Sequence, residues 1–383
     1  MKILFVYGNL VVQKTPNAYH HNFLQDIINR YSQFGQLTIC TSCKSCQSSQ
    51  NRILDMRNVR FRPIDKENTL IKRFFNHNNK KILYEEVQKS DFVIIHVPSS
   101  ESNLAAKYAR MLKKAYLCVV VGCVWDSLWN YNVKGKLLAP LDFYLMKKTV
   151  AKANYALYVT NTFLQHRYPC KNFNIGCSDV SISRLNEESL IHRIERITTW
   201  DKSSIRNVVS IGGLDVVFKG QQYIIKAIAK LNIDLGFNYH CYFIGAGDGL
   251  ALKKLSTKLH VEKYIHFLGS VNHDEIFNIF NKMDIYILAS KQEGLPRALV
   301  EAMSVGMPAL ASNIAGCPEL LNSDFLFPKG NVECLVDLLL KNNDEWINAA
   351  KLNIIKAKDY LEDSLTCRRN DFFSKIFREI KNN

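Results

Sequence analysis

The chain has 383 residues, of which 47% are hydrophobic and 22% are charged. This composition excludes a disordered protein, and the length exceeds that of one ordinary hydrophobic core, so we expect two domains. The apolar stretches, such as residues 115–125, are far shorter than the roughly 20 residues that a membrane-spanning helix needs. No small-residue cleavage site follows the N-terminal apolar run, so we predict a first strand there rather than a signal peptide.

The net charge of +15 lies almost entirely in one half of the chain. Residues 1–180 carry 25 lysines and arginines against 11 acidic residues, while the remainder carries 25 against 24. A basic half predicts a surface that meets an anionic partner, either phospholipid head groups or nucleic acid, although solubility alone explains the charge equally well. The basic pairs expected on such a surface are Lys72–Arg73, Lys80–Lys81, Lys113–Lys114 and Lys147–Lys148.

Eleven cysteines at irregular spacing favour a reducing compartment over a disulfide framework. Cys40, Cys43 and Cys46 have ligand-like spacing. A structural zinc site needs four ligands, however, and no second pair of similar spacing follows. We therefore interpret this segment as a polar loop that contains thiols, and we expect no metal.

Strand and helix patterns alternate along the chain, which predicts an α/β protein with doubly wound parallel sheets. Strands are predicted at 2–8, 91–97, 115–121, 155–160, 206–212, 239–245, 264–269, 284–290 and 307–312. Helical patterns cover 103–114, 139–153, 221–231, 248–260, 274–281 and 331–341. Because 181–205 is polar and lacks a strand pattern, we expect the domain boundary there. The predicted parts are a first domain (1–185), a linker (186–205), a second domain (206–360) and an amphipathic helix (361–383) that packs back on the domains.

The most informative stretch, residues 289–303, places Glu293 and Glu301 eight positions apart across a strand-to-helix turn. Pro296 fits the first turn of the helix, so the backbone amides of Gly294 and Leu295 are predicted to be available to an anion. Carboxylates on either side of a bound phosphate can accept hydrogen bonds from hydroxyls, as a nucleotide sugar would require. The alternative is structural: Glu293 caps the helix and Arg297 pairs with Glu301 on its surface.

Two further glycine-rich turns follow predicted strands in the same half of the chain. One contains Gly212 and Gly213 and leads to Lys219 at the start of a helix, where a lysine can neutralise a diphosphate. The other contains Gly245 and Gly247. A single turn of this kind is weak evidence, but three at the carboxyl ends of strands favour a phosphate-containing ligand.

The order and spacing of these motifs over residues 206–322 resemble the retaining GT-B glycosyltransferases of family 4. The resemblance implies two Rossmann-like domains that face each other across a cleft. It implies that Glu293 contacts hydroxyls of the donor sugar and Glu301 the donor ribose. Lys219 and the amides of Gly294 and Leu295 would hold the diphosphate. The stretch from Phe267 to Val271 would line the base pocket.

The chain departs from this family in two places. Many relatives have an arginine where this chain has Gly213, and Arg297 is our candidate to replace that positive charge. Many relatives also have a histidine in the loop after residues 115–121. This chain has none between His96 and His166, so Asp126 is the candidate catalytic group there, with helix capping as the alternative.

By this resemblance the protein is a glycosyltransferase that moves a sugar from a UDP- or GDP-sugar to a glycan acceptor with retention of configuration. Lys219, Arg297 and the helix N-terminus would stabilise the leaving diphosphate, so no metal or other cofactor is expected. We expect a lipid-linked or cell-surface polysaccharide acceptor, a cytoplasmic location and peripheral contact with the anionic membrane face. The alternatives are a GT-B epimerase or phosphorylase and a nucleic-acid-binding protein. No aromatic-rich basic motif supports the last, and we expect no nucleic acid partner.

Overall fold

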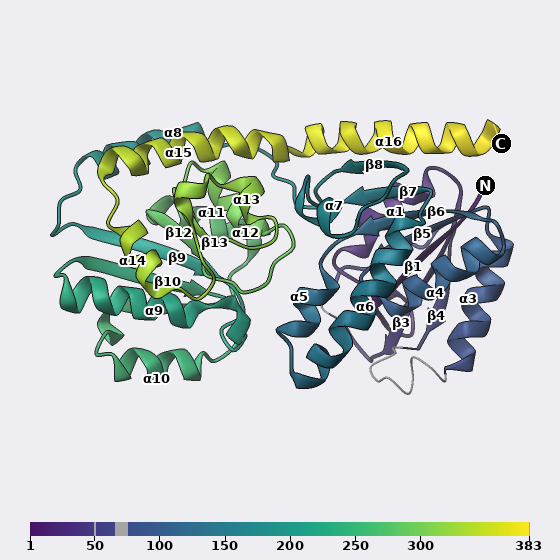
Figure 1. Cartoon of the computed structure of the whole chain (residues 1–383), viewed down its shortest axis with the longest axis horizontal. Coiled ribbons are helices and arrows are strands. Elements are labelled where there is room, and N and C mark those ends of the chain that lie inside the picture. The colour runs from purple at the N-terminus through teal and green to yellow at the C-terminus, as the bar shows by residue number, and fades with distance from the viewer. Residues whose placement is uncertain (50, 66–75, 383) are drawn as a thin grey trace. The chain divides into compact units, whose positions relative to one another are not determined.

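The computed structural model describes residues 1–49, 51–65 and 76–382. The chain divides into two compact units, which are described separately below (Figure 1). The first comprises Met1–Cys177 with Asp371–Asn383, and the second comprises Ser178–Asn370. Each unit contains a parallel sheet, so the predicted α/β fold with two doubly wound sheets is confirmed. No described helix combines the length and the apolar content that crossing a bilayer would require.

The sheet of the first unit has the strand order β4-β3-β1-β5-β6-β7-β8, with β2 pairing antiparallel to β1. Because β1 pairs in parallel with both β3 and β5, the chain reverses its winding direction between β1 and β5. The strands are β1 (Lys2–Lys14), β2 (Tyr19–His20), β3 (Gln36–Ser45), β4 (Val59–Ile64), β5 (Phe92–Val97), β6 (Ala115–Val120), β7 (Tyr155–Tyr158) and β8 (Phe173–Gly176).

Helices cover both faces of this sheet, so the buried parts of its central strands, such as 3–6 of β1 and most of β5 and β6, are rich in apolar residues. Leu4 and Val6 of β1 pack into the cluster formed with α3, α4 and α6. Phe5 points to the other face, where its ring lies 5.8 Å from that of Tyr31. The helices are α1 (Leu24–Ser32), α3 (His77–Lys89), α4 (Ser100–Met111), α5 (Val124–Trp129), α6 (Val133–Ala151) and α7 (Phe163–Arg167).

The sheet of the second unit has the order β11-β10-β9-β12-β13-β14, so its winding reverses between β9 and β12. This is the strand order of a dinucleotide-binding fold, in which ligands bind beyond the carboxyl ends of the strands at the reversal. The strands are β9 (Ile205–Ile211), β10 (Asn238–Ile244), β11 (Ile265–Gly269), β12 (Ile285–Leu288), β13 (Ala309–Ser312) and β14 (Leu326–Phe327).

Figure 1 shows α9 and α10 on one side of this sheet and α11, α12 and α13 on the other, and α14 packs against α9. The helices are α8 (Glu187–Thr198), α9 (Gln221–Ala229), α10 (Leu250–Lys258), α11 (His273–Lys282), α12 (Arg297–Ser304), α13 (Cys317–Leu320), α14 (Val332–Leu339), α15 (Asn343–Ala357) and α16 (Glu362–Asn382). Short 3-10 segments cover η1 (Val217–Lys219), η3 (Glu262–Tyr264), η4 (Ser323–Phe325) and η5 (Lys358–Tyr360), and η2 (Lys230–Asp234) is a π-helical turn.

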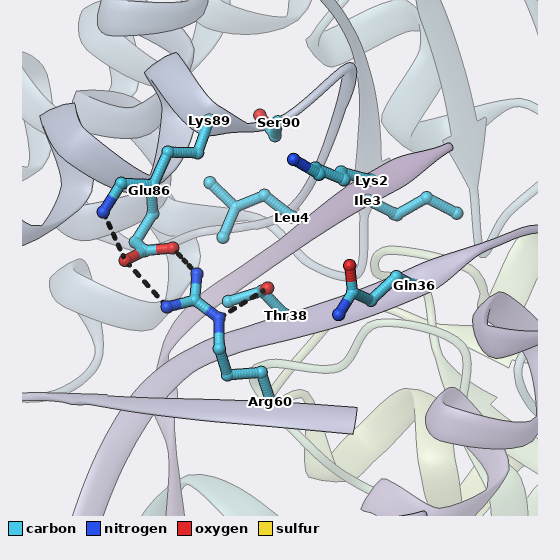
Figure 2. A pocket seen from close by; sticks show the side chains of 9 residues that line it. All are labelled: Lys2, Ile3, Leu4, Gln36, Thr38, Arg60, Glu86, Lys89 and Ser90. Atoms are coloured by element: carbon cyan, nitrogen blue, oxygen red, sulfur yellow. Dashed lines mark hydrogen bonds and ion pairs between the residues drawn. The ribbon is translucent and has the colours of Figure 1, made fainter. Parts of the chain in front are cut away.

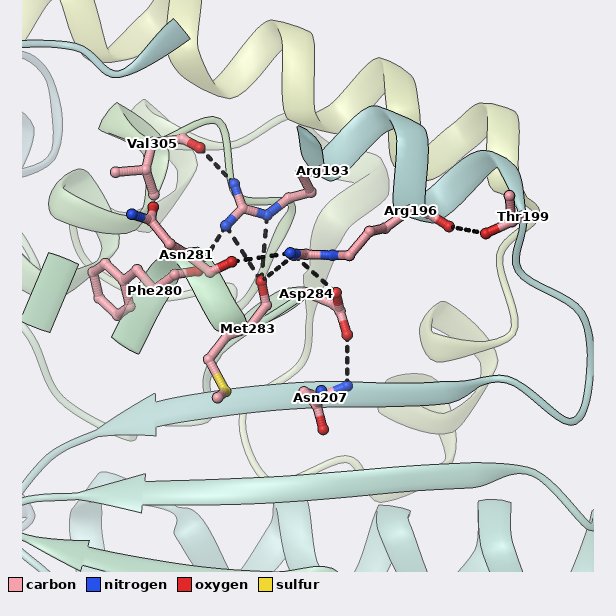
Figure 3. A network of polar contacts seen from close by, with 9 residues as sticks. All are labelled: Arg193, Arg196, Thr199, Asn207, Phe280, Asn281, Met283, Asp284 and Val305. Atoms are coloured by element: carbon pink, nitrogen blue, oxygen red, sulfur yellow. Dashed lines mark hydrogen bonds and ion pairs between the residues drawn. The ribbon is translucent and has the colours of Figure 1, made fainter. Parts of the chain in front are cut away.

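The segment 186–205 is not the linker that we predicted, because α8 packs into the second unit (Figure 3). Arg193 of α8 is fully buried and donates to the carbonyl oxygens of Phe280, Met283 and Val305. These carbonyls lie at the carboxyl ends of α11 and α12, where helix dipoles favour a cation. Burial lowers the pKa of Arg193 to about 9, so the side chain is still charged at neutral pH. The polar sequence of α8 therefore conceals a structural contact.

The C-terminal helix α16 is shared by the two units, with the division at Asn370. Its aromatic residues pack within the first unit. Phe373 makes an edge-on contact with Tyr31, at 5.5 Å between ring centres, and Phe377 stacks on Phe34 at 4.2 Å. These contacts explain why the apolar side of this helix is buried although the segment lies at the end of the chain.

Candidate active site

The turns that follow β9 and β12 meet at the point where the second sheet reverses its winding. Gly220, just after η1, has φ +75°, and a Cβ there would collide with the carbonyl oxygen of Ala289. This close approach holds Lys219 against the next turn, where its Nζ donates to Oε1 of Glu293 at 2.8 Å. The structure thus brings together two of the predicted site residues.

The turn between β12 and α12 leaves backbone donors available. Pro296 is the N-cap of α12, one residue before the position that we expected, and no side chain caps this helix. The carbonyl oxygen of Gly294 accepts from the amide of Gly316 at 3.1 Å. The amides of Gly294 and Leu295 have no hydrogen-bond partner among the described residues. Two N–H groups at a helix N-terminus, next to a lysine, can bind a phosphate group.

Glu301, in the second turn of α12, is only 3% exposed and needs a partner. Its Oε1 lies 3.0 Å from Nε2 of His273 at the start of α11. The side chain of His273 is 60% exposed, so it can leave Glu301 without disturbing the core. His273 could not be predicted from the sequence, because nothing in the local pattern connects residues 28 positions apart.

The negative charges of Glu293 and Glu301 act on the buried side chains beneath the site. Tyr286 of β12 is fully buried, and burial raises its pKa well above the usual value, with the charges of Glu293 and Glu301 adding to the effect. Burial also raises the pKa of Cys317, and Glu293 again contributes. Both groups are therefore neutral at physiological pH. Lys219 is the cation that directly offsets Glu293.

The glycine turns after β9 and β10 have a structural explanation in this fold. Gly212 donates to Ile244, and a Cβ on Gly245 would collide with the carbonyl oxygen of Gly212. The carboxylate of Asp215 accepts from the amides of Asp248 and Gly249 at 3.1 Å each, and a Cβ on Gly247 would collide with it. Asp215 thus already binds two amides at the start of α10, next to the predicted residues Gly245 and Gly247.

The remaining predicted donor-site residues lie on different elements. Gly213 is next to Val216, whose side chain a Cβ on Gly213 would touch. Phe267 of β11 packs against the core beneath α9 and α10, and Lys253 lies over its ring at 5.4 Å. Val271 instead packs against the cluster that contains α11 and α12. The segment from Phe267 to Val271 therefore connects the two faces of the sheet.

Arg297 is exposed and donates to the carbonyl oxygen of Asp179 at 3.4 Å. The surface pair between Arg297 and Glu301 does not form in this structure, because Glu301 bonds to His273 instead. Lys219 bonds to Glu293, whereas Arg297 is held at Asp179. The proposed replacement of a missing arginine by Arg297 thus requires movement of its side chain.

In the first unit, Asp126 lies in the first turn of α5, whose N-cap is Cys123. Capping by Asp126 is therefore not observed. Its Oδ1 lies 3.5 Å from Nη2 of Arg167, and the Nε of Arg167 donates to Sγ of Cys123 at 3.1 Å. Asp126 is thus half of an ion pair at the carboxyl end of β6, a pairing that the sequence did not reveal.

A second acidic group in the first unit lies where its sheet reverses, between β1 and β5. Glu101 of α4 is buried and accepts from the hydroxyl of Ser99 at 2.8 Å. The same hydroxyl accepts from the amide of Gly8 at 3.1 Å, and a Cβ on Gly8 would collide with Glu101. Glu101 was not predicted from the sequence, in which we expected this helix to begin at residue 103 rather than at Ser100.

A cavity of about 210 Å³ in the first unit lies at the opposite edge of the sheet (Figure 2). It is lined by residues at the amino ends of strands, including Lys2 and Gln36. The buried carboxylate of Glu86 is paired there with Arg60, and Lys89 lies 3.9 Å away. Because ligands of doubly wound sheets bind at the carboxyl ends, we interpret this cavity as a structural ion-pair cluster.

All eleven cysteines lie among the described residues, and none forms a disulfide. Cys40 and Cys43 belong to β3 rather than to a loop, and Cys46 follows its end. Across residues 1–49, 51–65 and 76–382, no group of three histidine, cysteine or acidic residues is arranged to hold a metal. Of the basic pairs, Lys72–Arg73 lies outside the described residues.

Residues 202–356 match the family described as "Glycosyl transferases group 1". The protein CapJ of Staphylococcus aureus is 32% identical over 354 residues, which cover 88% of this chain and 85% of CapJ. The chain belongs to the group 1 glycosyltransferases. The resemblance to the retaining GT-B enzymes of family 4 is thereby confirmed.

Other similar proteins are more distant from this chain. The O-antigen biosynthesis glycosyltransferase WbnH of Escherichia coli is 23% identical over 284 residues, 73% of this chain and 75% of WbnH. Among solved structures, Anabaena Alr3699/HepE in complex with UDP has a TM-score of 0.67 and 14% identity, covering 98% of this chain and all of that one (100%). The last similarity shows the fold alone.

Proposed function

We propose that the second unit binds a nucleotide diphosphate sugar through the turns after β9 and β12, and that the enzyme transfers the sugar to a glycan with retention of configuration. The observation that carries the proposal is the contact between Lys219 and Glu293 beside the unpartnered amides of Gly294 and Leu295. A cation and two N–H donors suit a diphosphate, and a carboxylate on each side suits sugar and ribose hydroxyls.

The chemical step requires stabilisation of the departing nucleoside diphosphate. Negative charge grows on its terminal phosphate as the bond to the sugar breaks, and preformed donors stabilise that charge most strongly in the transition state. Lys219 and the amides of Gly294 and Leu295 take this role. Glu293 binds a sugar hydroxyl and orients the ring, while Glu301 binds the ribose. Arg297 adds positive charge if it leaves Asp179, and no metal is required.

We assign acceptor binding to the first unit, where Asp126 is a candidate group for contacting the acceptor. The acceptor is a glycan of a surface polysaccharide, held on a lipid at the cytoplasmic face of the membrane. The O-antigen role in the name of WbnH and the excess of basic residues in 1–180 support this assignment.

The test is an assay of nucleoside diphosphate release across a panel of UDP- and GDP-sugars, with the Glu293→Gln variant as control. We expect one donor to be hydrolysed slowly by the full chain and not by the variant. Nuclear magnetic resonance of the released sugar reports its configuration. Conversion of the nucleotide sugar to an isomer without release of diphosphate indicates an epimerase and contradicts the proposal, as does the absence of any reaction over the whole panel.

A further inference from the structure

Helix α6 of the first unit has an apolar surface on its solvent side. Val133, Leu137 and Tyr144 are 74%, 79% and 60% exposed, and Leu141 and Leu145 are exposed as well. Their spacing of three and four residues places them along one side of the helix. The opposite side carries Met146 and Val150, which are part of the core cluster. A surface helix normally has polar residues on its outer face, and an exposed apolar surface of this kind is typical of an interaction site.

Helix α5 extends this apolar surface. It packs against α6, and the two helices lie side by side in Figure 1. The ring of Trp129 is 43% exposed and stacks on Trp125 at 5.2 Å. Tyr131, in the connection to α6, is 77% exposed. We define the α5–α6 patch by its exposed apolar residues, which are Trp129, Tyr131, Val133, Leu137, Leu141, Tyr144 and Leu145.

Lysines surround the patch, and no exposed acidic side chain of α6 opposes them. They are Lys134, Lys136, Lys147 and Lys148, all exposed. Lys136 lies 5.8 Å from the ring centre of Trp129, and Lys148 lies 6.0 Å from that of Tyr144. Asp142, the acidic residue of α6, is buried. Leucine and valine flanked by tryptophan, tyrosine and lysine match the layers of a bilayer, from acyl chains to the boundary and the anionic head groups.

We propose that the α5–α6 patch docks the enzyme on an anionic phospholipid bilayer. α5 follows β6, so the patch begins at the carboxyl edge of the first sheet, where doubly wound sheets bind their ligands. The inference rests on the proposed function in one respect: a lipid-linked acceptor would be presented at that edge. This docking differs from a purely electrostatic contact, because the apolar side chains enter the bilayer while the lysines give a preference for anionic lipids.

The test is flotation of the full chain with vesicles of phosphatidylcholine, with and without phosphatidylglycerol, in the absence of substrate. We expect binding to the anionic vesicles that weakens as salt rises. The double variant Leu137→Ser with Leu141→Ser should bind the anionic vesicles at least about tenfold more weakly than the wild type. The control Met111→Ser replaces an apolar residue of α4 that is 61% exposed, and it should bind like the wild type.

A second pair of variants tests the charge. Lys136→Glu with Lys147→Glu should lose the preference for anionic vesicles, whereas Lys80→Glu with Lys81→Glu on α3 should keep most of it. The fluorescence of Trp129 should shift to shorter wavelength on binding and disappear from the signal in Trp129→Phe. If the leucine variant is unstable to heat, the Lys136 and Lys147 variant and the fluorescence shift still decide the question.

Three outcomes overturn the proposal. They are absence of binding by the wild type, equal binding by the leucine variant, and a wild-type dimer that becomes a monomer in that variant while vesicle binding persists. The last would make the patch an interface between copies of the chain. Hydrolysis of the nucleotide sugar without vesicles should be unchanged in the leucine variant. A failure of docking is therefore distinguishable from a failure of the proposed function.

Discussion

The ammonium group of Lys219 and the carboxylate of Glu293 lie 2.8 Å apart, although 74 residues separate them in the chain. They lie in the turns that follow β9 and β12, the two strands between which the second sheet reverses. In the unliganded protein each group neutralises the other. A bound diphosphate sugar would divide the pair, with phosphate oxygens on Lys219 and a sugar hydroxyl on Glu293. The predictions for this site follow from that exchange of partners.

Glu293→Gln should lower kcat about 100-fold, because the amide binds the sugar hydroxyl more weakly in the transition state than the carboxylate does. Inhibition by the free nucleoside diphosphate should not weaken, since Lys219 loses a competing anion. Steady-state kinetics with product inhibition measure both effects. Unchanged turnover at an unchanged melting temperature would mean that Glu293 has only a structural role in the turn.

Glu301→Gln should weaken binding of a ribonucleotide about tenfold and that of a 2′-deoxyribonucleotide less, because the lost hydrogen bonds are to ribose hydroxyls and the deoxy sugar has one hydroxyl fewer. His273→Ala should act in the opposite direction and strengthen nucleotide binding a few-fold, since His273 competes for the same carboxylate. Titration calorimetry measures these differences. His192→Ala is the matched control, an exposed histidine of the same unit. Weaker nucleotide binding in His273→Ala would show that His273 supports the site rather than blocking it.

The turns of the second unit could be predicted because their signals are local. A strand followed by glycines and a helix is visible within about ten residues. The positions of Lys219 and Gly294 in such turns, and of Glu301 in the helix after one of them, could therefore be predicted from sequence. Their partners could not. His273 meets Glu301, and Asp215 fills the turn after β10, only because the sheet brings distant loops together.

Helix α8 was misread for a different physical reason. Its charged residues suggested a solvated linker, but Arg193 is buried against the carboxyl ends of two helices. Sequence periodicity treats arginine as polar and therefore exposed. The acidic residue Glu101 was missed in the same way, since burial of a carboxylate depends on the hydroxyl of Ser99 and the space left by Gly8.

Transfer should persist in excess EDTA, because Lys219 and the amides of Gly294 and Leu295 supply the positive charge that a diphosphate requires. The assay is nucleoside diphosphate release before and after chelation, with the preferred donor. Complete loss of activity that magnesium or manganese restores would place the chemistry in a metal-dependent class.

The second unit should become less stable as the pH falls through the range in which histidine titrates. Nδ1 of His240 lies 3.0 Å from Nε2 of His266, and the two rings are stacked. Burial lowers the pKa of both histidines below 6.5, and proximity of the pair lowers that of His240 further. As the pH falls, these histidines are protonated in the unfolded chain before they are protonated in the folded one. Their contribution to the free energy of unfolding is therefore fully present above pH 6.5 and is lost below it.

Thermal unfolding at about pH 7.5 and about pH 5.5 checks this expectation. The wild type should melt at a lower temperature in acid, and His266→Gln should reduce the difference. Burial also lowers the pKa of His21 in the first unit. Its contribution to the loss of stability in acid has the same direction and should remain after the substitution. Equal melting temperatures at both pH values in the wild type would contradict the account.

Calorimetric titration of nucleoside diphosphates and monophosphates into the wild type and Lys219→Ala tests the central claim most directly. If the turns after β9 and β12 hold a diphosphate, one diphosphate (UDP or GDP) should bind the wild type. Lys219→Ala should then weaken it about tenfold or more while leaving the corresponding monophosphate unchanged. Absence of nucleotide binding, or an equal effect of Lys219→Ala on diphosphate and monophosphate, would contradict the assignment of this site.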